Sequence, residues 1–314
     1  MWKTMNQKEL ALKIHESKKI VSGHRTCPGC PICIILRTAL ATQDCPVVVA
    51  SATSCAEVTT TIYPYTSWNT PWIHSLFANA AATISGVESA YLALKKKGKI
   101  KEEIKFMVFG GDGGLMDIGL ASLSGALERG HDAVYICYGN EGYQNTGAQR
   151  SSNTPYGAST TTTPSGKASL GKTEFPKDLA KIAIAHNIPY VATINPADLG
   201  DMFEKIKKAF EKKGPSVLVA FAACPTNMKA PSNQTIPISK LAIETNSYPL
   251  YEYEDGKYKI NYKPEKRKSI EEFLKTQTKF NAVLKNKEEI KKIQAFVDKE
   301  WKELLLKEKI SNSK

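Results

Sequence analysis

The sequence lacks any long hydrophobic run. No stretch of its 314 residues approaches the roughly 18 to 20 apolar residues that span a bilayer. Its first segment, MWKTMNQKELALKIHESKK, lacks the unbroken apolar core of a secretory signal. Internal repeats are also missing, which excludes repeat architectures. We therefore expect a globular cytoplasmic protein without membrane-spanning segments.

Cysteine is scarce, and its number is odd. Seven cysteines in a cytoplasmic protein argue against a disulfide framework and for reduced thiols, some of which could bind metal. The chain has 43 basic and 31 acidic residues, a net charge of +12, which could attract an acidic partner. Lysine-rich helix faces such as LKKKGKIKEEIK account for much of this excess without any partner.

Short apolar runs alternate with amphipathic helical patterns. Buried strands are predicted at residues 45–53, 105–110, 132–139, 189–194 and 215–222. Helical spacing occurs at residues 72–98, 115–130 and 199–214. This alternation predicts an α/β fold with a doubly wound, mostly parallel sheet. The chain is charged from residue 257 onward, so we expect a main domain of residues 1–256 and a helical C-terminal extension of residues 257–314, packed on the body or on a partner subunit.

A lone carboxylate stands among glycines directly after the apolar run FMVF. Asp112 lies in GGDGGLMDIG, where a predicted strand leads into a helix. Ligands bind at the carboxyl ends of strands in open α/β sheets, and phosphates favour glycine turns at helix N-termini. An aspartate would repel a phosphate unless a divalent cation lay between them. The motif therefore suggests Mg²⁺ bound to a diphosphate, although GDGG alone is more often a tight turn.

The next predicted strand ends in a second polar motif. NEGYQNTG places Asn140 and Asn145 at the equivalent carboxyl end, so two neighbouring strands present oxygen ligands at one edge. Residues 142–176 then lack periodicity and are rich in Thr, Ser, Asn, Gly and Pro. A loop of this length inside a compact domain is usually functional or disordered.

The cysteines begin with CPGC. Cys27 and Cys30 could bind zinc, form a redox pair or ligate an iron–sulfur cluster. Cys33 extends the run, but Arg37 stands where bacterial ferredoxins carry a fourth cysteine. The ferredoxin interpretation is therefore disfavoured. Cys33, Cys45 and Cys137 are interpreted as small buried apolar residues.

Four segments together resemble one family. GDGG, LMDIGLASLSGALERGH, NEGYQNTGAQRSSNTPYGASTTTTP and LAIETNSYPLYEYEDG are similar to the thiamine-diphosphate-binding beta subunit of 2-oxoacid:ferredoxin oxidoreductases, the pyruvate synthase family. The resemblance extends from about Gly23 to Trp301. It implies the thiamine-diphosphate-binding fold and, for the loop of residues 142–176, a wall of the cofactor site.

The resemblance also implies the roles of individual residues. Asp112, the side chain of Asn140 and the carbonyl of Gly142 would ligate Mg²⁺, and Asn145 would be the catalytic residue, beside the diphosphate and the substrate. The implied cofactor-binding set is Gly111, Asp112, Gly113, Gly114, Asn140, Gly142, Tyr143, Asn145 and Thr146. One position departs from the family, because Gly139 stands where an acidic residue is usual.

For the cysteines, the resemblance selects a set from distant segments. Cys27, Cys30, Cys55 in SCAEV and Cys224 in ACPTN would hold one [4Fe-4S] cluster. Pro31 and Asn227 stand where glycine is common in the family. These departures bear on the hydrogen bonding and the potential of the cluster.

The resemblance implies oxidative decarboxylation of a 2-oxoacid, with pyruvate as the expected substrate, to acyl-CoA and CO₂. Electrons would pass through the cluster to ferredoxin. Partner subunits of alpha, gamma and delta types would supply the glutamate that activates thiamine and most of the substrate pocket, so the chain alone should be inactive. Alternative substrates are oxalate, a branched-chain 2-oxoacid and 2-oxoglutarate.

A competing hypothesis of another class is a zinc-stabilised, basic nucleic-acid-binding protein. It depends on CPGC and the charge of +12. Such a protein should cluster arginine, lysine and aromatic residues on one face. Here the basic residues are spread over helices, and the hypothesis gives GDGG and NEGYQNTG no purpose. We therefore expect no nucleic-acid partner.

Overall fold

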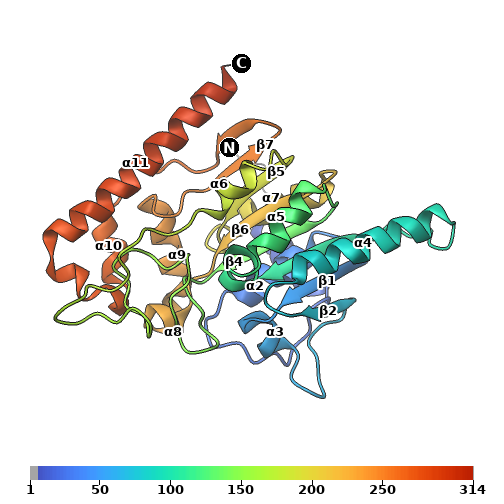
Figure 1. The fold of residues 1–314 in the computed structure, drawn as a ribbon, viewed down its shortest axis with the longest axis horizontal. Coiled ribbons are helices and arrows are strands. Elements are labelled where there is room, and N and C mark those ends of the chain that lie inside the picture. The colour runs from blue at the N-terminus through green and yellow to red at the C-terminus, as the bar shows by residue number, and fades with distance from the viewer. Residues whose placement is uncertain (1–5, 314) are drawn as a thin grey trace.

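A mixed sheet of eight strands forms the centre of the computed structural model, which describes residues 6–313 (Figure 1). The strand order is β2-β1-β3-β4-β6-β5-β7-β8. The strands are β1 (Val47–Ala52), β2 (Trp72–Ser75), β3 (Lys105–Gly110), β4 (Val134–Gly139), β5 (Tyr190–Ile194), β6 (Ser216–Phe221), β7 (Tyr251–Glu254) and β8 (Lys257–Ile260). The first six in chain order are parallel, and β7 and β8 pair antiparallel. The predicted α/β class is confirmed.

Helices cover both faces of this sheet because its central strands are apolar on both sides. In β3, Phe106 and Val108 face a core with one set of helices, and Met107 and Phe109 face the core on the other side. The first core involves α4 (Ala80–Lys96), α5 (Leu120–Glu128) and α6 (Leu179–Ile184), whereas the second involves α2 (Ile32–Ala41) and α7 (Leu199–Glu211). The N-terminal helix α1 (Gln7–Glu16) packs near α2.

One of the remaining helices follows β1, and the others follow β6 and β8. They are α3 (Cys55–Thr60), α8 (Pro225–Met228), α9 (Thr235–Glu244), α10 (Ile270–Lys275) and α11 (Lys287–Asn312), with short 3₁₀ turns η2 (Ser232–Gln234), η3 (Thr278–Phe280) and η4 (Val283–Lys285). The long helix α11 runs along one side of the molecule (Figure 1). It buries Ile293, Val297 and Leu304, and Phe296 stacks on Phe175 with ring centroids 4.0 Å apart. The C-terminal helices thus share a core with the loop before α6.

One local prediction was wrong. The helix expected from Trp72 begins at Ala80, because residues 72–75 form the edge strand β2 beside β1. The division expected between residues 256 and 257 stays a prediction; it lies at the start of β8, which pairs with β7 in the sheet. Residues 1–5 and 314 of the two predicted segments lie outside the described residues.

The parallel strands β1, β3, β4 and β6 end at one edge of the sheet. The segments that follow them contain Cys55, Asp112, Asn140 and Cys224. Topology alone therefore gathers most of the predicted site residues, at the edge where open α/β sheets bind ligands. None of the helices within residues 6–313 has the combination of length and apolar composition needed to cross a membrane.

Glu252 on β7 provides a test of how the antiparallel end of the sheet is stabilised. Only 3 % of the side chain is exposed, and its carboxylate accepts hydrogen bonds from Tyr190 (2.8 Å), Lys208 (2.7 Å), Lys259 (3.0 Å) and Asn261 (3.0 Å). Burial raises the pKa of Glu252, but these donors outweigh it and lower the pKa to about 2. The ionised carboxylate therefore stabilises the fold above its unfolded-state pKa, and this contribution is lost as the pH falls toward 2.

We expect Glu252→Gln to lower the free energy of unfolding by about 2 to 3 kcal/mol at pH 7, with a smaller deficit below about pH 4.5. Urea unfolding at pH 7 and pH 3.5 would measure the difference. The exposed Glu211, whose nearest basic partner is Lys207 at 3.9 Å, is the control, and Glu211→Gln should change stability little. A deficit that stays constant with pH would contradict this account.

Candidate functional site

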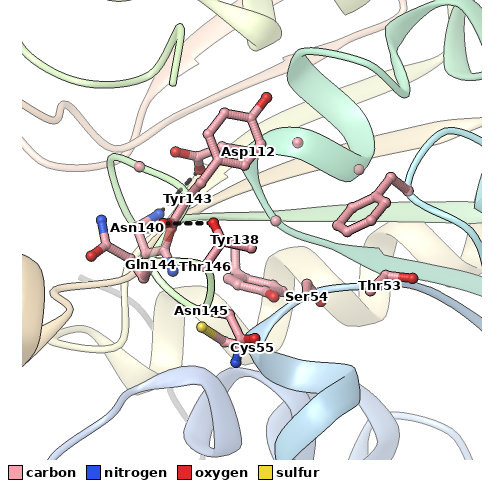
Figure 2. Close-up of a pocket in the computed structure, with 15 residues that line it drawn as sticks. Thr53, Ser54, Cys55, Asp112, Tyr138, Asn140, Tyr143, Gln144, Asn145 and Thr146 are labelled. Carbon is pink, nitrogen blue, oxygen red and sulfur yellow. Dashed lines mark hydrogen bonds between the residues drawn. The ribbon is translucent and has the colours of Figure 1, made fainter. Parts of the chain in front are cut away.

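A cleft of about 390 Å³ opens at the carboxyl edge of the sheet. Its walls come from the segments after β1, β3 and β4 and from Phe77. The lining includes the whole predicted cofactor-binding set: Gly111, Asp112, Gly113, Gly114, Asn140, Gly142, Tyr143, Asn145 and Thr146. Figure 2 shows Asp112 and Tyr143 on one side of the cleft and Asn145 beside Cys55 on the other. The structure thus brings these residues together, while their individual roles stay predictions.

Asp112 is a buried carboxylate whose direct partners are neutral. It is 2 % exposed and accepts hydrogen bonds from Asn140 N (3.2 Å), Ser151 Oγ (2.7 Å) and Asn153 Nδ2 (3.3 Å). Burial raises its pKa to about 7 despite these bonds. A charge held this way is unfavourable unless a cation compensates it. The buried carboxylate oxygens of Asp112 therefore fit a hard divalent cation in the cleft.

The glycines let the turn after β3 approach its neighbour closely. Residues 112–116 form one π-helical turn before α5. A Cβ on Gly114 would lie 2.5 Å from Cβ of Ala52 on β1, closer than side chains allow. Asp117 then secures the turn by accepting hydrogen bonds from Tyr143 Oη (2.8 Å) and Ser152 N (3.1 Å). The cleft floor is thus fixed before any ligand binds.

The segment after β4 forms the opposite wall. Tyr143 and Gln149 exchange two backbone hydrogen bonds of 2.9 and 3.2 Å, which close the turn that carries Asn145 and Thr146. Asn140 is buried, whereas Asn145 is exposed and hydrogen-bonds to Cys55. The turn therefore presents Asn145 to solvent at the rim of the cleft.

Gln144 is a site residue that the sequence analysis missed. Its Oε1 and Nε2 atoms are both buried, and neither has a hydrogen-bond partner within residues 6–313. The side chain packs where a Cβ on Gly142 would be, with Nε2 2.5 Å from that position. Unsatisfied buried amides are unfavourable, so this one indicates a missing polar ligand.

The four predicted cluster ligands line a second cavity of about 770 Å³. Cys27 and Cys30 come from the turn before α2, Cys55 from the start of α3, and Cys224 from the segment after β6. Cys33, Cys45 and Cys137 are not among its lining residues; Cys33 and Cys137 are buried, and Cys45 is half-buried. The structure therefore separates the cysteines into the same two groups as the prediction.

Cys30 and Cys55 would be protonated without a metal. Burial, followed by the charge of neighbouring cysteines, raises the pKa of Cys30 to about 12 and that of Cys55 to about 11. Across the described part of the chain, no three His, Cys, Asp or Glu side chains converge to hold a single ion. Four thiolates around one zinc would have to lie within about 4 Å of one another, given Zn–S bonds of about 2.3 Å. The described residues therefore do not preform a site for a single metal ion.

The two cavities share a wall. Cys55, Asn140, Gln144 and Asn145 line both. Asn227, where the family commonly has glycine, connects the same regions: its Nδ2 donates to the carbonyls of Asn140 (2.7 Å) and Glu141 (3.3 Å), and its backbone N–H contacts Cys224 Sγ at 3.5 Å. A group in the cleft and a group among the cysteines would therefore be direct neighbours.

Comparisons with known proteins agree with this arrangement. Residues 50–220 match the family model described as the thiamine pyrophosphate enzyme C-terminal TPP-binding domain. A solved 2-oxoglutarate:ferredoxin oxidoreductase from Magnetococcus marinus superposes with a TM-score of 0.56 over 67 % of this chain and 68 % of that chain. At 23 % identity, this likeness concerns the fold alone.

Two curated relatives are much closer in sequence. Pyruvate synthase subunit PorB of Thermotoga maritima is 47 % identical, and the alignment covers 99 % of this chain and 98 % of the relative. Ketoisovalerate oxidoreductase subunit VorB of Pyrococcus horikoshii is 44 % identical, with 95 % of each chain covered. Identity at this level over the full length confirms the resemblance found in the glycine, asparagine and cysteine motifs: the chain belongs to the thiamine-diphosphate-binding subunits of the 2-oxoacid oxidoreductase family that includes pyruvate synthase.

Proposed function

We propose that this chain is the thiamine-diphosphate- and cluster-binding subunit of a pyruvate:ferredoxin oxidoreductase. The observation that carries the proposal is the wall shared by the cleft and the cysteine cavity. Thiamine diphosphate supplies the electron sink for cleavage between the carboxylate and keto carbon of a 2-oxoacid. Electrons released in the cleft would need an acceptor nearby. The neighbouring cysteine cavity, which Cys55 lines together with the cleft, offers a place for one.

The chain's own residues would bind and orient the cofactor. Asp112, Asn140 and the carbonyl of Gly142 would hold Mg²⁺, which explains why a buried carboxylate has neutral partners only. Gly111, Gly113 and Gly114 would admit the diphosphate close to the backbone, with the Tyr143 ring packed beside Gly113 and Thr146 also lining the cleft. Asn145, exposed beside Cys55, would contact the substrate as the catalytic residue.

Cys27, Cys30, Cys55 and Cys224 would ligate one [4Fe-4S] cluster. We expect Cys30→Ala to lose most of the iron and its ferredoxin-reducing activity, because one thiolate ligand is removed. Cys33→Ala is the matched control, since Cys33 lies three residues away outside the cavity lining and should retain its iron. Iron and sulfide analysis with EPR of the reduced complex would measure both variants. A Cys30→Ala complex with full iron would contradict the ligand assignment.

The cleft requires partner subunits to become an active site. Asn145, Thr146 and Cys27 are exposed, so the chain alone leaves the site open to water. We propose partners of alpha, gamma and delta types, and ferredoxin as the electron acceptor that the basic surface would attract. The complex would work in the cytoplasm, without membrane or nucleic-acid partners. Full turnover by the isolated chain would contradict this requirement.

Pyruvate is the proposed substrate because the relative at 47 % identity is named pyruvate synthase, although a relative at 44 % is named ketoisovalerate oxidoreductase. A panel of 2-oxoacids assayed on the assembled complex, with and without coenzyme A, tests this choice. We expect the highest kcat/KM for pyruvate and a requirement for coenzyme A. A preference for a branched-chain acid, 2-oxoglutarate or oxalate would overturn it.

A further inference from the structure

Asn153 occupies space that exists only because residue 139 is glycine. Gly139 is the last residue of β4, directly before Asn140. A Cβ at this position would lie 2.7 Å from Nδ2 of Asn153 and 3.5 Å from the carbonyl oxygen of Ala220 on β6. The first distance is shorter than side-chain contacts allow, so any other residue at 139 would displace the Asn153 amide.

The displaced amide would be one of the groups that hold Asp112. Asn153 Nδ2 donates to Oδ1 of Asp112 at 3.3 Å, and the backbone N–H of Asn140 donates to the same oxygen at 3.2 Å. Ser151 Oγ donates to Oδ2 at 2.7 Å, and Asn153 N in turn donates to Ser151 Oγ at 3.2 Å. A carboxylate accepts about four hydrogen bonds. Asn140 and Asn153 thus share Oδ1 and Ser151 bonds to Oδ2, while the backbone N–H of Gly142 also interacts with the carboxylate.

Asn153 reaches Asp112 from outside the cleft. It is absent from the cleft lining, and it lines instead two cavities of about 790 and 1200 Å³ that extend toward α11. Aromatic residues such as Phe221, Tyr248 and Phe296 surround the smaller of these cavities. The Asn153 amide therefore lies between the Asp112 carboxylate and the aromatic residues of the smaller cavity.

We propose that Asn153 is a positioning residue for the cation-binding carboxylate of Asp112, and that Gly139 is required because it admits the Asn153 amide. This inference rests on the proposed Mg²⁺–diphosphate site. By occupying Oδ1 from behind, Asn153 fixes the rotation of the carboxylate and leaves Oδ2 toward the cleft. Groups that orient a metal ligand in this way typically change metal affinity about 10- to 100-fold when removed.

A double-mutant cycle on the assembled complex tests the pair. We expect Asn153→Ala to raise the Mg²⁺ concentration needed for thiamine diphosphate binding about 10-fold or more, with kcat recovered at saturating Mg²⁺. Gly139→Ala should have at least the same effect, because its methyl group displaces the amide. Gly139→Ala/Asn153→Ala should lose no more than Asn153→Ala alone, since no amide remains to be displaced. Calorimetric titration with Mg²⁺ and thiamine diphosphate measures each corner of the cycle.

Controls separate positioning from folding. Thermal unfolding of the metal-free complexes should change little in Asn153→Ala, and Asn153→Ser provides a second shortened side chain. Thr163→Ala, in the same loop but bonded to Thr160, should bind Mg²⁺ as the wild type does. Wild-type affinity in both Asn153 variants, or additive losses in the cycle, would overturn the inference. A wild-type complex that binds no thiamine diphosphate would instead overturn the proposed function.

Discussion

Asp112→Asn should abolish Mg²⁺-dependent cofactor binding and at the same time stabilise the metal-free protein. The two effects have one cause. A carboxylate at 2 % exposure with three neutral hydrogen-bond donors is unfavourable when ionised, and burial raises its pKa to about 7. Asparagine keeps nearly the same shape, removes the charge and can still accept from Asn140 and Asn153. The Ser151 hydroxyl can reverse and accept from the new amide.

The pH dependence gives the sign of this effect. Because the folded-state pKa of Asp112 lies above the ordinary value of 3.8, the wild type should lose stability as the pH rises from about 4 to 7. The variant lacks this loss, so its advantage should grow over the same range to about 1 to 3 kcal/mol at pH 8 without Mg²⁺. Millimolar Mg²⁺ with thiamine diphosphate should stabilise only the wild type.

Asp117→Asn is the matched control, five residues away in the same turn. Burial raises the pKa of Asp117, but hydrogen bonds from Ser152 and Tyr143 and the charge of Lys177 lower it below its ordinary value. Neutralising Asp117 should therefore destabilise the protein at neutral pH, the opposite sign. Urea unfolding from pH 4 to 8 with EDTA compares the variants. An Asp112→Asn protein that is less stable than the wild type at pH 8, or that binds the cofactor normally, would contradict the assignment.

The strands that position the site could be predicted because they are buried on both faces. β3, β4, β5 and β6 are continuous apolar runs bounded by polar or glycine-rich segments, and this pattern identifies central parallel strands. β2 was missed because its four residues, three half-buried and His74 exposed, lie at the sheet edge and run directly into a helical pattern. The β7–β8 hairpin had a signal, Asp255–Gly256 between alternating residues, which was assigned to a domain boundary instead.

The candidate site likewise contains residues that the sequence could identify and residues that it could not. Asp112, Asn140, Cys55 and Cys224 lie in short motifs after strands, and Cys27 and Cys30 lie in the CPGC turn before α2, so spacing and resemblance identified them. Ser151, Asn153 and Asn227 act through contacts that no local pattern encodes. Asn227, for example, reaches the carbonyl of Asn140 across 87 positions of sequence. Residues of this kind are found only when the fold places them against a motif.

Lys279, in the C-terminal segment, is another residue that contacts the site from a distant position in the sequence. Its side chain is 1 % exposed on η3 and forms an ion pair with Glu141, 138 positions away, between Asn140 and Gly142. Its carbonyl also accepts from Ser159 N at 3.0 Å, inside the long loop. The C-terminal helices therefore reach the wall of the cofactor cleft through one buried charge.

We expect Lys279→Met to lower the free energy of unfolding by about 3 to 5 kcal/mol, because it leaves Glu141 buried without its counter-charge. Glu141→Gln should destabilise for the same reason. The double variant should lose less than the sum of the two, since neither charge then remains unpaired. Thiamine diphosphate affinity should fall in the single variants, because Glu141 lies between two proposed Mg²⁺ donors.

Lys275 provides the comparison within the same segment. Its pair with Glu271 has a similar geometry at 2.7 Å but is exposed on both sides, so Lys275→Met should change the free energy of unfolding by less than about 1 kcal/mol. Urea unfolding of the four variants and the wild type at pH 7 would measure these differences. If Lys279→Met behaved like Lys275→Met, the buried pair would not hold the Asn140–Gly142 wall. Water or a rearranged loop would then have to compensate the charge of Glu141 when Lys279 is removed.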